Sequence, residues 1–381
     1  MSTNHPHGAM IIQHTIVTHD PGKWSAVPAN NGANGPVWQW GNELLVGFTQ
    51  GEAFFTGRGH QVDDGQPQHS WLARSLDGGE SWQVGAARFG EAGFPYAGGA
   101  NCQGKEALSL PGAVDFTHPG FVMRVEGHGY HGNAGQHWFY SLDRGVKWMG
   151  PYGFGALLDH PELAGRQFTA RTAYLVNSAS GCFVFLSARS AGIPGQQVSL
   201  TDKVFLAQST DGGLSFQFVA WVAPPTDAAR AVMPAPVRLS PERMVAAVRR
   251  RHDAFASCWI DCFHTSDHGL SWSFLSRVGE TGGSNGNPPA LVRLQDGRLC
   301  CVYGNRDRAV MLARFSADEG ASWGPEQVLR DDFQSKNGSM DLGYARLFQR
   351  PDGKLAAVYF WCSPERPETH IAATIFEPSP C

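Results

Sequence analysis

The stretch Ser75-Leu76-Asp77-Gly78-Gly79-Glu80-Ser81-Trp82 decides the fold, because its pattern Ser/Thr-x-Asp-x-Gly-x-x-Trp occurs five times in this chain of 381 residues. The other copies are SLDRGVKW at 141–148, STDGGLSF at 209–216, TSDHGLSW at 265–272 and SADEGASW at 316–323. Their aspartates are Asp77, Asp143, Asp211, Asp267 and Asp318, which lie 66, 68, 56 and 51 residues apart. Five copies, with Phe216 as the one aromatic exchange, indicate a repeat architecture.

Each copy predicts a hairpin turn. The Asp and the Ser or Thr side chains can accept hydrogen bonds from backbone N–H groups of the turn. The glycine supplies a backbone with positive φ at little steric cost. The Trp begins the next strand and offers a large apolar face that packs under the hairpin. We therefore interpret the repeat as a structural element and look for function elsewhere in the chain.

This pattern is the Asp-box, or BNR repeat, and the chain resembles the sialidase superfamily. The resemblance implies an all-β, six-bladed β-propeller with its boxes at the blade periphery and its active site at the mouth of the central channel. The segments 10–24 and 369–376 have strand character but no box. Pairing them in one shared blade would close the ring and remove two sheet edges. We thus predict a single domain over residues 1–381.

Six stretches are predicted to open blades with an inner strand, and they begin near Gly35, Lys105, Thr169, Met233, Pro288 and Gly343. The dipeptides Gly41-Asn42, Asp296-Gly297 and Asp352-Gly353 are typical of hairpin turns between such strands. No stretch predicts an amphipathic helix. The 46 glycines and 24 prolines agree with a chain of many tight turns.

Composition narrows the classes of partner. A formal charge of −4, without a long run of Lys and Arg, argues against a nucleic-acid surface. No apolar run approaches the length of a membrane span. The first ten residues, MSTNHPHGAM, show no signal peptide, so we expect a cytoplasmic protein. The eight cysteines form no C-x-x-C pair, and we expect reduced, buried thiols.

The resemblance also implies a catalytic pair. The family's acid/base aspartate precedes the first box by about a dozen residues, which selects Asp63, with Asp64 as the fallback. Its nucleophile is a tyrosine on the inner strand of the last blade, which selects Tyr344, followed by the Asp352-Gly353 hairpin. A tyrosine is used because the anomeric carbon of sialic acid bears a carboxylate that repels an anionic nucleophile.

Arginines are expected to bind the substrate carboxylate, because guanidinium groups stay charged and bind carboxylates in bidentate fashion. The resemblance selects Arg249, at the end of the second strand of blade four, and Arg306 or Arg308 before the last box. Two family features are missing. No Phe/Tyr-Arg-Ile-Pro motif occurs in 30–40, and the family's glutamate falls near Met233. By position, Arg171 would replace the missing arginine and Glu106 the missing glutamate.

A histidine-rich loop at 127–137 contains His128, Tyr130, His131 and His137. A His/Tyr pair beside an arginine could abstract the C5 proton of a uronate. The alternative is that these histidines are solvated or stack on a sugar. The loop lacks the carboxylate partner of a metal site, so we expect no metal or cofactor.

These features predict an exo-acting glycoside hydrolase of sialidase type that cleaves a terminal acidic sugar, sialic acid by family resemblance. The alternatives are a polysaccharide lyase acting on uronates and a propeller that binds acidic glycans without turnover. In each case the partner is a glycan, with no nucleic acid and no membrane.

Overall fold

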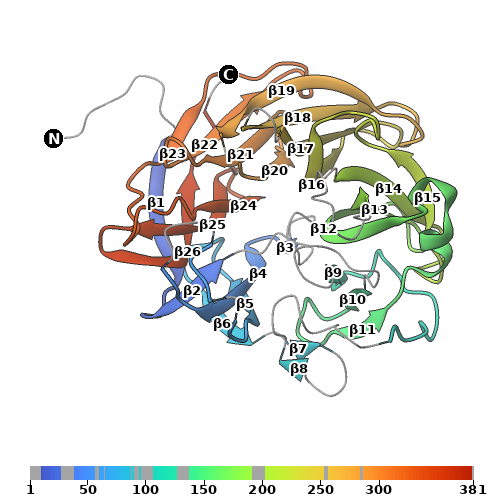
Figure 1. Cartoon of the computed structure of the whole chain (residues 1–381), viewed down its shortest axis with the longest axis horizontal. Helices are drawn as coiled ribbons and strands as arrows, with labels where there is room; N and C mark the ends of the chain where they lie inside the picture. The colour runs from blue at the N-terminus through green and yellow to red at the C-terminus, as the bar shows by residue number, and fades with distance from the viewer. Residues whose placement is uncertain are drawn as a thin grey trace, which may run out of the picture.

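The described strands form six sheets that are arranged as blades around one axis, and a small two-stranded sheet of β7 (Arg88–Phe89) and β8 (Phe94–Pro95) (Figure 1). The computed structural model describes residues 10–26, 38–55, 60–63, 65–86, 88–89, 94–95, 106–126, 137–190, 202–252, 256–283 and 286–379. The prediction of an all-β, six-bladed propeller is confirmed.

The blades follow one another along the chain, and each is antiparallel. Blade one contains β3 (Trp38–Trp40), β4 (Glu43–Glu52), β5 (His69–Ser75) and β6 (Gln83–Ala86), and β2 (Lys23–Ala26) also pairs with β4. Blade two contains β9 (Val122–Glu126), β10 (His137–Ser141) and β11 (Met149–Tyr152). Blade three contains β12 (Arg166–Val176), β13 (Cys182–Ser190), β14 (Lys203–Ser209) and β15 (Gln217–Trp221). Blade four contains β16 (Arg230–Arg238), β17 (Met244–His252), β18 (Ser257–Thr265) and β19 (Ser273–Gly282); blade five contains β20 (Ala290–Arg293), β21 (Leu299–Asn305), β22 (Val310–Ser316) and β23 (Gln327–Arg330); blade six contains β24 (Gly343–Gln349), β25 (Leu355–Ser363), β26 (Arg366–Phe376) and β1 (Ile11–Thr18).

The two ends of the chain share blade six. Strand β1 pairs antiparallel with β26, and the register begins at Ile11 opposite Phe376. His14 Nδ1 and Thr374 Oγ1 lie 2.9 Å apart across this pair. The ring closure predicted for the terminal strands is therefore present, and it makes blade one the neighbour of blade six.

The first box shows the predicted turn geometry. Ser75 Oγ accepts a hydrogen bond from Gly79 N at 2.8 Å, and Asp77 Oδ1 accepts one from Ser81 N at 2.9 Å. Gly79 has a φ of 99°, and Trp82 Nε1 donates to Gly79 O. Although partial burial acts in the opposite direction, the hydrogen bonds from Ser81 and Ser75 hold the pKa of the Asp77 carboxyl at about 2. The other four boxes repeat the central bond from glycine N to the Ser or Thr hydroxyl.

The glycines of the boxes lie against the preceding blade. A Cβ added to Gly145, in the box of blade two, would lie 2.5 Å from Leu45 Cδ2 of blade one. One added to Gly269, in blade four, would lie 2.5 Å from Leu206 Cδ2 of blade three. The glycine thus serves the turn and also allows neighbouring blades to approach closely.

The prediction that blade two opens with an inner strand near Lys105 is wrong. Within 106–120 the chain forms only one isolated bridge, between Leu108 and Tyr152. Val114 N instead donates to Gly212 O, and Phe116, which is buried, donates its N–H to Ala179 O of the β12–β13 turn. The segment therefore packs across to blade three, where its apolar side chains join the core between the two blades.

Helix is scarce in the described part of the chain, as predicted. It comprises two 3-10 turns, η1 (Gly155–Asp159) and η2 (Pro161–Leu163), and no described helix is long and apolar enough to cross a membrane. Six of the cysteines are buried free thiols, whereas Cys102 and Cys381 lie outside the described residues.

Candidate functional site at the channel mouth

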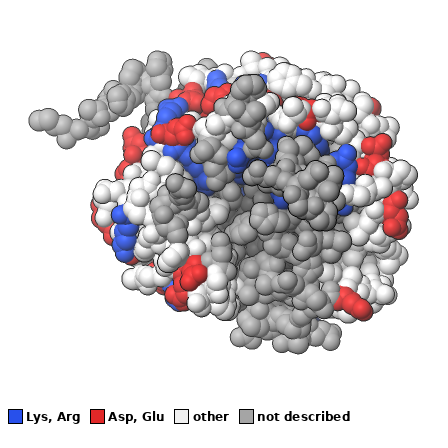
Figure 2. Space-filling model, in the orientation of Figure 1, with Lys and Arg blue, Asp and Glu red and all other residues white. Residues whose placement is uncertain are grey.

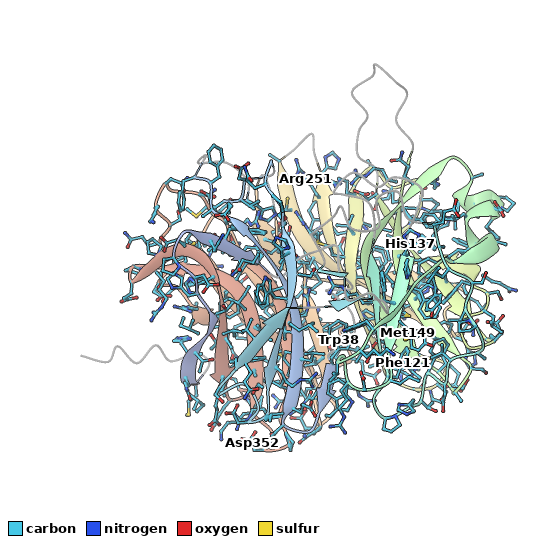
Figure 3. All side chains as sticks on the ribbon, turned by 90° about the horizontal axis from the view of Figure 1, so that it is seen from below. Trp38, Phe121, His137, Met149, Arg251 and Asp352 are labelled. Atoms are coloured by element: carbon cyan, nitrogen blue, oxygen red, sulfur yellow. The ribbon has the colours of Figure 1, made fainter. Side chains whose placement is uncertain are left out.

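The two ends of the ring differ in composition. Figure 3 places Arg251, near the end of β17, at one end of the ring axis and Asp352, in the β24–β25 hairpin, at the other. Lys and Arg side chains gather in an arc near the centre of the face in Figure 2, and Asp and Glu lie mostly closer to its rim. We call the Arg251 end the mouth, and its central side chains are those of His60, Arg249, Arg306, Asp341 and Tyr344.

Tyr344 is held in an unusual backbone conformation at the mouth. It is the second residue of β24 and has a φ of 48°, which is rare for a bulky residue. The register of β24 against β25 shifts between Gly343 and Arg346, so the tyrosine sits in a bulge. Tyr344 N donates to Asn287 Oδ1 at 3.3 Å, and the residue is 6% exposed. Such strain persists only where the surroundings enforce it, and it clusters at functional sites.

Two arginines from neighbouring blades surround the tyrosine. Arg249 Nη1 donates to Tyr344 Oη at 3.5 Å, and Arg306 Cζ lies 5.8 Å from the centre of the Tyr344 ring. Both arginines are buried, and burial lowers the pKa of the Arg249 guanidinium. The backbone oxygen of Leu342 accepts from Arg306 Nη2 at 3.3 Å. The geometry brings Arg249, Arg306 and Tyr344 together.

Arg308, the alternative to Arg306, lies apart from this cluster. Its side chain is 49% exposed and pairs with Glu326, which precedes β23. Arg250 also points away from Tyr344, as strand alternation predicts, because it pairs with Asp227.

Met233 occupies in blade four the position that Tyr344 occupies in blade six. Each lies two residues before a residue that pairs with the fourth residue of the second strand, namely Ala235 with Ala247 and Arg346 with Val358. Met233 also has a positive φ, 55°, and its Sδ lies 3.4 Å from Arg249 Nη1. The position where a glutamate was sought thus holds a thioether beside the arginine.

Arg171 has the same register position on β12 as Met233 has on β16. It lies two residues before Ala173, and Ala173 pairs with Phe185, the fourth residue of β13. Its backbone therefore lies within the inner strand of blade three, at the level of Met233. Its side chain lies outside the described residues.

The sequence reasoning missed a buried ion pair beside Tyr344. His60 Nδ1 lies 2.7 Å from Asp341 Oδ1, and Asp341 is fully buried while 21% of the His60 side chain is exposed. The His60 ring packs edge-on against the Tyr344 ring, with centroids 6.0 Å apart. Asp341 Oδ2 also accepts from Trp24 Nε1 at 2.7 Å and from Gln61 N at 2.9 Å. Signals existed, since His60 precedes Asp63 by three residues and Asp341 precedes Tyr344 by three.

Charge pairing dominates the electrostatics of this ion pair. Burial acts to lower the pKa of His60, but the Asp341 carboxylate at hydrogen-bond distance raises it above the ordinary value of 6.5. Burial acts to raise the pKa of Asp341, but His60 and Arg306 hold it below the ordinary value of 3.8. His60 is thus a titratable base whose proton affinity is increased beside a tyrosine.

The remaining predicted residues are less closely joined to the mouth. Asp63 is partly buried and follows the His60 loop, and its Oδ1 accepts from Gly65 N at 2.9 Å. Glu106 is exposed on the segment that leads to blade two. His137, predicted in a loop, is instead the buried first residue of β10. Asp64, His128, Tyr130 and His131 lie outside the described residues. Among the described residues, no group of His, Cys, Asp and Glu could hold a metal ion.

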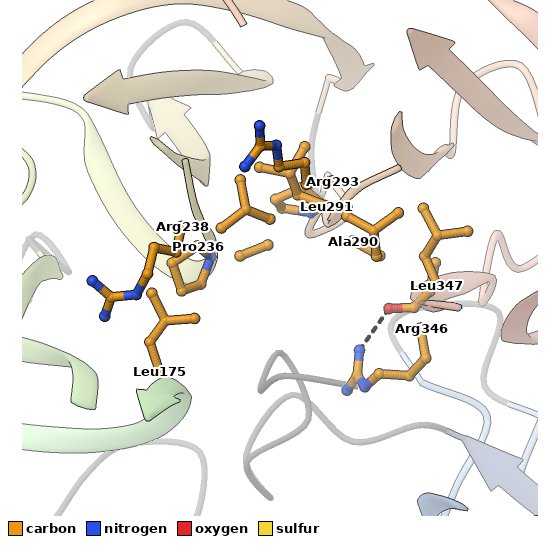
Figure 4. A pocket seen from close by; sticks show the side chains of 13 residues that line it. Leu175, Pro236, Arg238, Ala290, Leu291, Arg293, Arg346 and Leu347 are labelled. Carbon is orange, nitrogen blue, oxygen red and sulfur yellow. Dashed lines mark hydrogen bonds between the residues drawn. The ribbon is translucent and has the colours of Figure 1, made fainter. Parts of the chain in front are cut away.

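A separate pocket lies further along the axis, among the inner strands of blades three to six (Figure 4). Its lining includes Arg346 but none of the five mouth residues.

Comparison with known proteins supports the fold more strongly than any activity. No curated protein matches. Among solved structures, a protein of unknown function from Dyadobacter fermentans DSM 18053 has a TM-score of 0.67 at 20% identity, covering 98% of this chain and 100% of that chain. The Hadza microbial sialidase Hz136 has a TM-score of 0.56 at 13% identity, covering 93% of this chain and 66% of that chain. The alpha-L-arabinanase of Penicillium chrysogenum has a TM-score of 0.57 at 13% identity, covering 96% and 98%.

These likenesses establish that the propeller distantly resembles those of sialidases and arabinanases. A family model described as "BNR repeat-like domain" matches residues 116–357, and the chain belongs to that family.

Proposed function

We propose that the protein is a glycoside hydrolase that cleaves a terminal acidic sugar at the mouth, with Tyr344 as nucleophile and Asp63 as acid/base. The observation that carries this proposal is the strained Tyr344, whose hydroxyl accepts from Arg249 and whose ring lies beside Arg306. Two guanidinium groups would bind the carboxylate of an acidic sugar and would also stabilise a phenolate.

A base is needed because a tyrosine has an ordinary pKa of about 10. With Met233 at the position of the missing glutamate, His60 supports this role best. Its Nδ1 faces Asp341, which would orient the ring and stabilise the imidazolium that forms. The phenol proton would pass to the neutral form of His60, whose population grows as the pH rises through its raised pKa, as Tyr344 Oη attacks the anomeric carbon. Asp63 would protonate the departing glycosidic oxygen, and water would then hydrolyse the glycosyl–tyrosine bond.

The test is hydrolysis of a panel of aryl glycosides, comprising an α-sialoside, a β-glucuronide and, because one structural neighbour is an arabinanase, an α-L-arabinofuranoside. We expect release of the aryl alcohol from an acidic glycoside, and we expect the neutral arabinoside to be a poor substrate because it offers no carboxylate to the two arginines. Turnover of the arabinoside alone would contradict the acidic-sugar proposal.

A second function is favoured by one specific observation, the His60–Asp341 pair next to Tyr344. A uronate lyase needs a base for the C5 proton, an acid for the leaving oxygen, and a cation on the carboxylate. His60, Tyr344 and Arg249 would supply these three roles. Ultraviolet absorbance of an unsaturated uronate product, without release of a saturated sugar, would identify this reaction. Binding of acidic glycans without either product would identify a non-catalytic propeller.

A further inference from the structure

The pocket along the axis is distinct from the mouth and is built by four blades. It has a volume of about 300 Å³ and is lined by consecutive residues of inner strands. Leu175 comes from β12, Pro236 from β16, Leu291 from β20 and Leu347 from β24 (Figure 4). Its walls are therefore mainly aliphatic, and the volume is at the lower end of what small-molecule sites enclose.

Arg346 lies on β24 at the register position that alanines occupy on β16 and β20, the inner strands of blades four and five. The register shows this equivalence: Ala235 pairs with Ala247, Ala290 with Val302, and Arg346 with Val358, each the fourth residue of the second strand counted from Met244, Leu299 and Leu355 as the first. Two alanines thus leave space beside the axis, and blade six places a guanidinium at that level. In Figure 4 its side chain projects from β24 into the space between the strands.

The described side chains that line the pocket carry positive charge only. Its described lining contains three arginines, Arg238, Arg293 and Arg346, and no carboxylate. Arg346 is the most buried of the three, at 9% exposure, and its Nη1 donates to Ala345 O at 2.6 Å. Burial lowers its pKa to about 9. A carboxylate placed against a guanidinium forms charge-assisted hydrogen bonds, which are shorter and stronger than neutral ones.

We propose that this pocket binds a small carboxylate with a compact apolar body, its carboxylate on Arg346 and its body against Ala290 and Leu347. Aliphatic walls and one deep cation fit such a ligand better than a sugar, which would need polar partners for each hydroxyl. The site is independent of the proposed hydrolysis, because the mouth residues are not part of its lining.

Isothermal titration of the full chain with benzoate, and in parallel with benzamide, tests the proposal. Benzamide has the same shape but no charge. We expect saturable binding of benzoate at least about tenfold tighter than binding of benzamide, since hydrogen bonds to charged groups are worth more than neutral ones. Equal binding of the two, or no saturable binding of benzoate, would overturn the proposal.

Four variants locate the ligand. Arg346→Met removes the charge, and Ala290→Val narrows the pocket but keeps the charge; each should weaken benzoate binding at least about tenfold. Arg308→Met, an exposed arginine beside Glu326, should bind benzoate as the unmodified chain does. Circular dichroism checks folding, and Ala290→Val decides if Arg346→Met fails to fold. Loss of binding in Arg249→Met, with Arg346→Met unaffected, would place the carboxylate at the mouth and refute the pocket.

Discussion

The box turns and the mouth are built by opposite means. In the first box the bonds of Asp77 and Ser75 reach residues no more than four positions away. At the mouth, His60 and Asp341 are 281 residues apart and Arg249 and Tyr344 are 95 apart. The boxes therefore depend on local sequence, whereas the mouth exists only after the ring has closed and blade one lies beside blade six.

This contrast predicts that the mouth can lose its chemistry while the fold survives. Tyr344→Phe removes only a hydroxyl. If Tyr344 is the nucleophile, turnover of the acidic glycoside should fall at least about 10²-fold with the thermal unfolding midpoint nearly unchanged. The measurement pairs a rate assay with a melting curve. Near-full turnover in this variant on every acidic glycoside tested would refute the retaining mechanism.

What could be predicted from sequence follows the same division. Asp77, Gly79 and Trp82 stand at fixed short spacings, and the turn chemistry of each follows from its own residue type. Tyr344, Arg249 and Arg306 were found only through a family resemblance, and their closeness needed the structure.

The missed parts depend on partners that lie far apart in the sequence. The His60–Asp341 pair was missed because a histidine in a loop carries no periodic signal, and its partner lies in another blade. The inner strand of blade two was predicted to begin near Lys105, but the backbone N–H groups of Val114 and Phe116 donate to blade three instead.

The second prediction concerns the cost of breaking the buried pair at the mouth. Asp341→Asn leaves His60, Trp24 and Gln61 facing a neutral amide and should lower the free energy of unfolding by about 3 kcal/mol, because removing one partner of a buried pair is strongly destabilising. Urea unfolding of both proteins measures the difference.

The His60–Asp341 pair also makes the stability lost in Asp341→Asn depend on pH. The pKa of His60 is raised in the folded state, so its charge adds stability that is complete below 6.5 and disappears as the pH rises through the folded pKa. The difference between wild type and Asp341→Asn should therefore shrink in mildly alkaline buffer. A constant difference across this range would mean that His60 is not charged in the pair.

The third prediction separates two costs of replacing a glycine in a box, namely the backbone strain of the turn and the clash with the neighbouring blade. Gly145 and Gly22 have nearly equal φ angles, 81° and 79°, but a Cβ at Gly145 meets Leu45 Cδ2 at 2.5 Å and one at Gly22 meets nothing within 4 Å. Both alanine variants bear the strain of a left-handed residue, and Gly145→Ala should cost about 2 kcal/mol more, from the clash between blades. Equal losses in urea unfolding would show that the close approach is irrelevant to stability.

The smallest effect is expected at Arg308, and it sharpens the choice between the two arginines that the sequence left open. Arg308 is half exposed and pairs with Glu326 at the surface, so Arg308→Met should change the free energy of unfolding by less than about 0.5 kcal/mol and leave kcat and KM unaltered. Arg306→Met removes a buried guanidinium beside Tyr344 and should raise KM for the acidic glycoside about tenfold, since a charged hydrogen bond to substrate is lost. Kinetics of the two variants side by side provide the measurement. Because both lose the same charge, a general electrostatic effect would change them alike, and an effect of Arg306→Met alone would mean that this guanidinium acts locally, on the substrate carboxylate or on Tyr344.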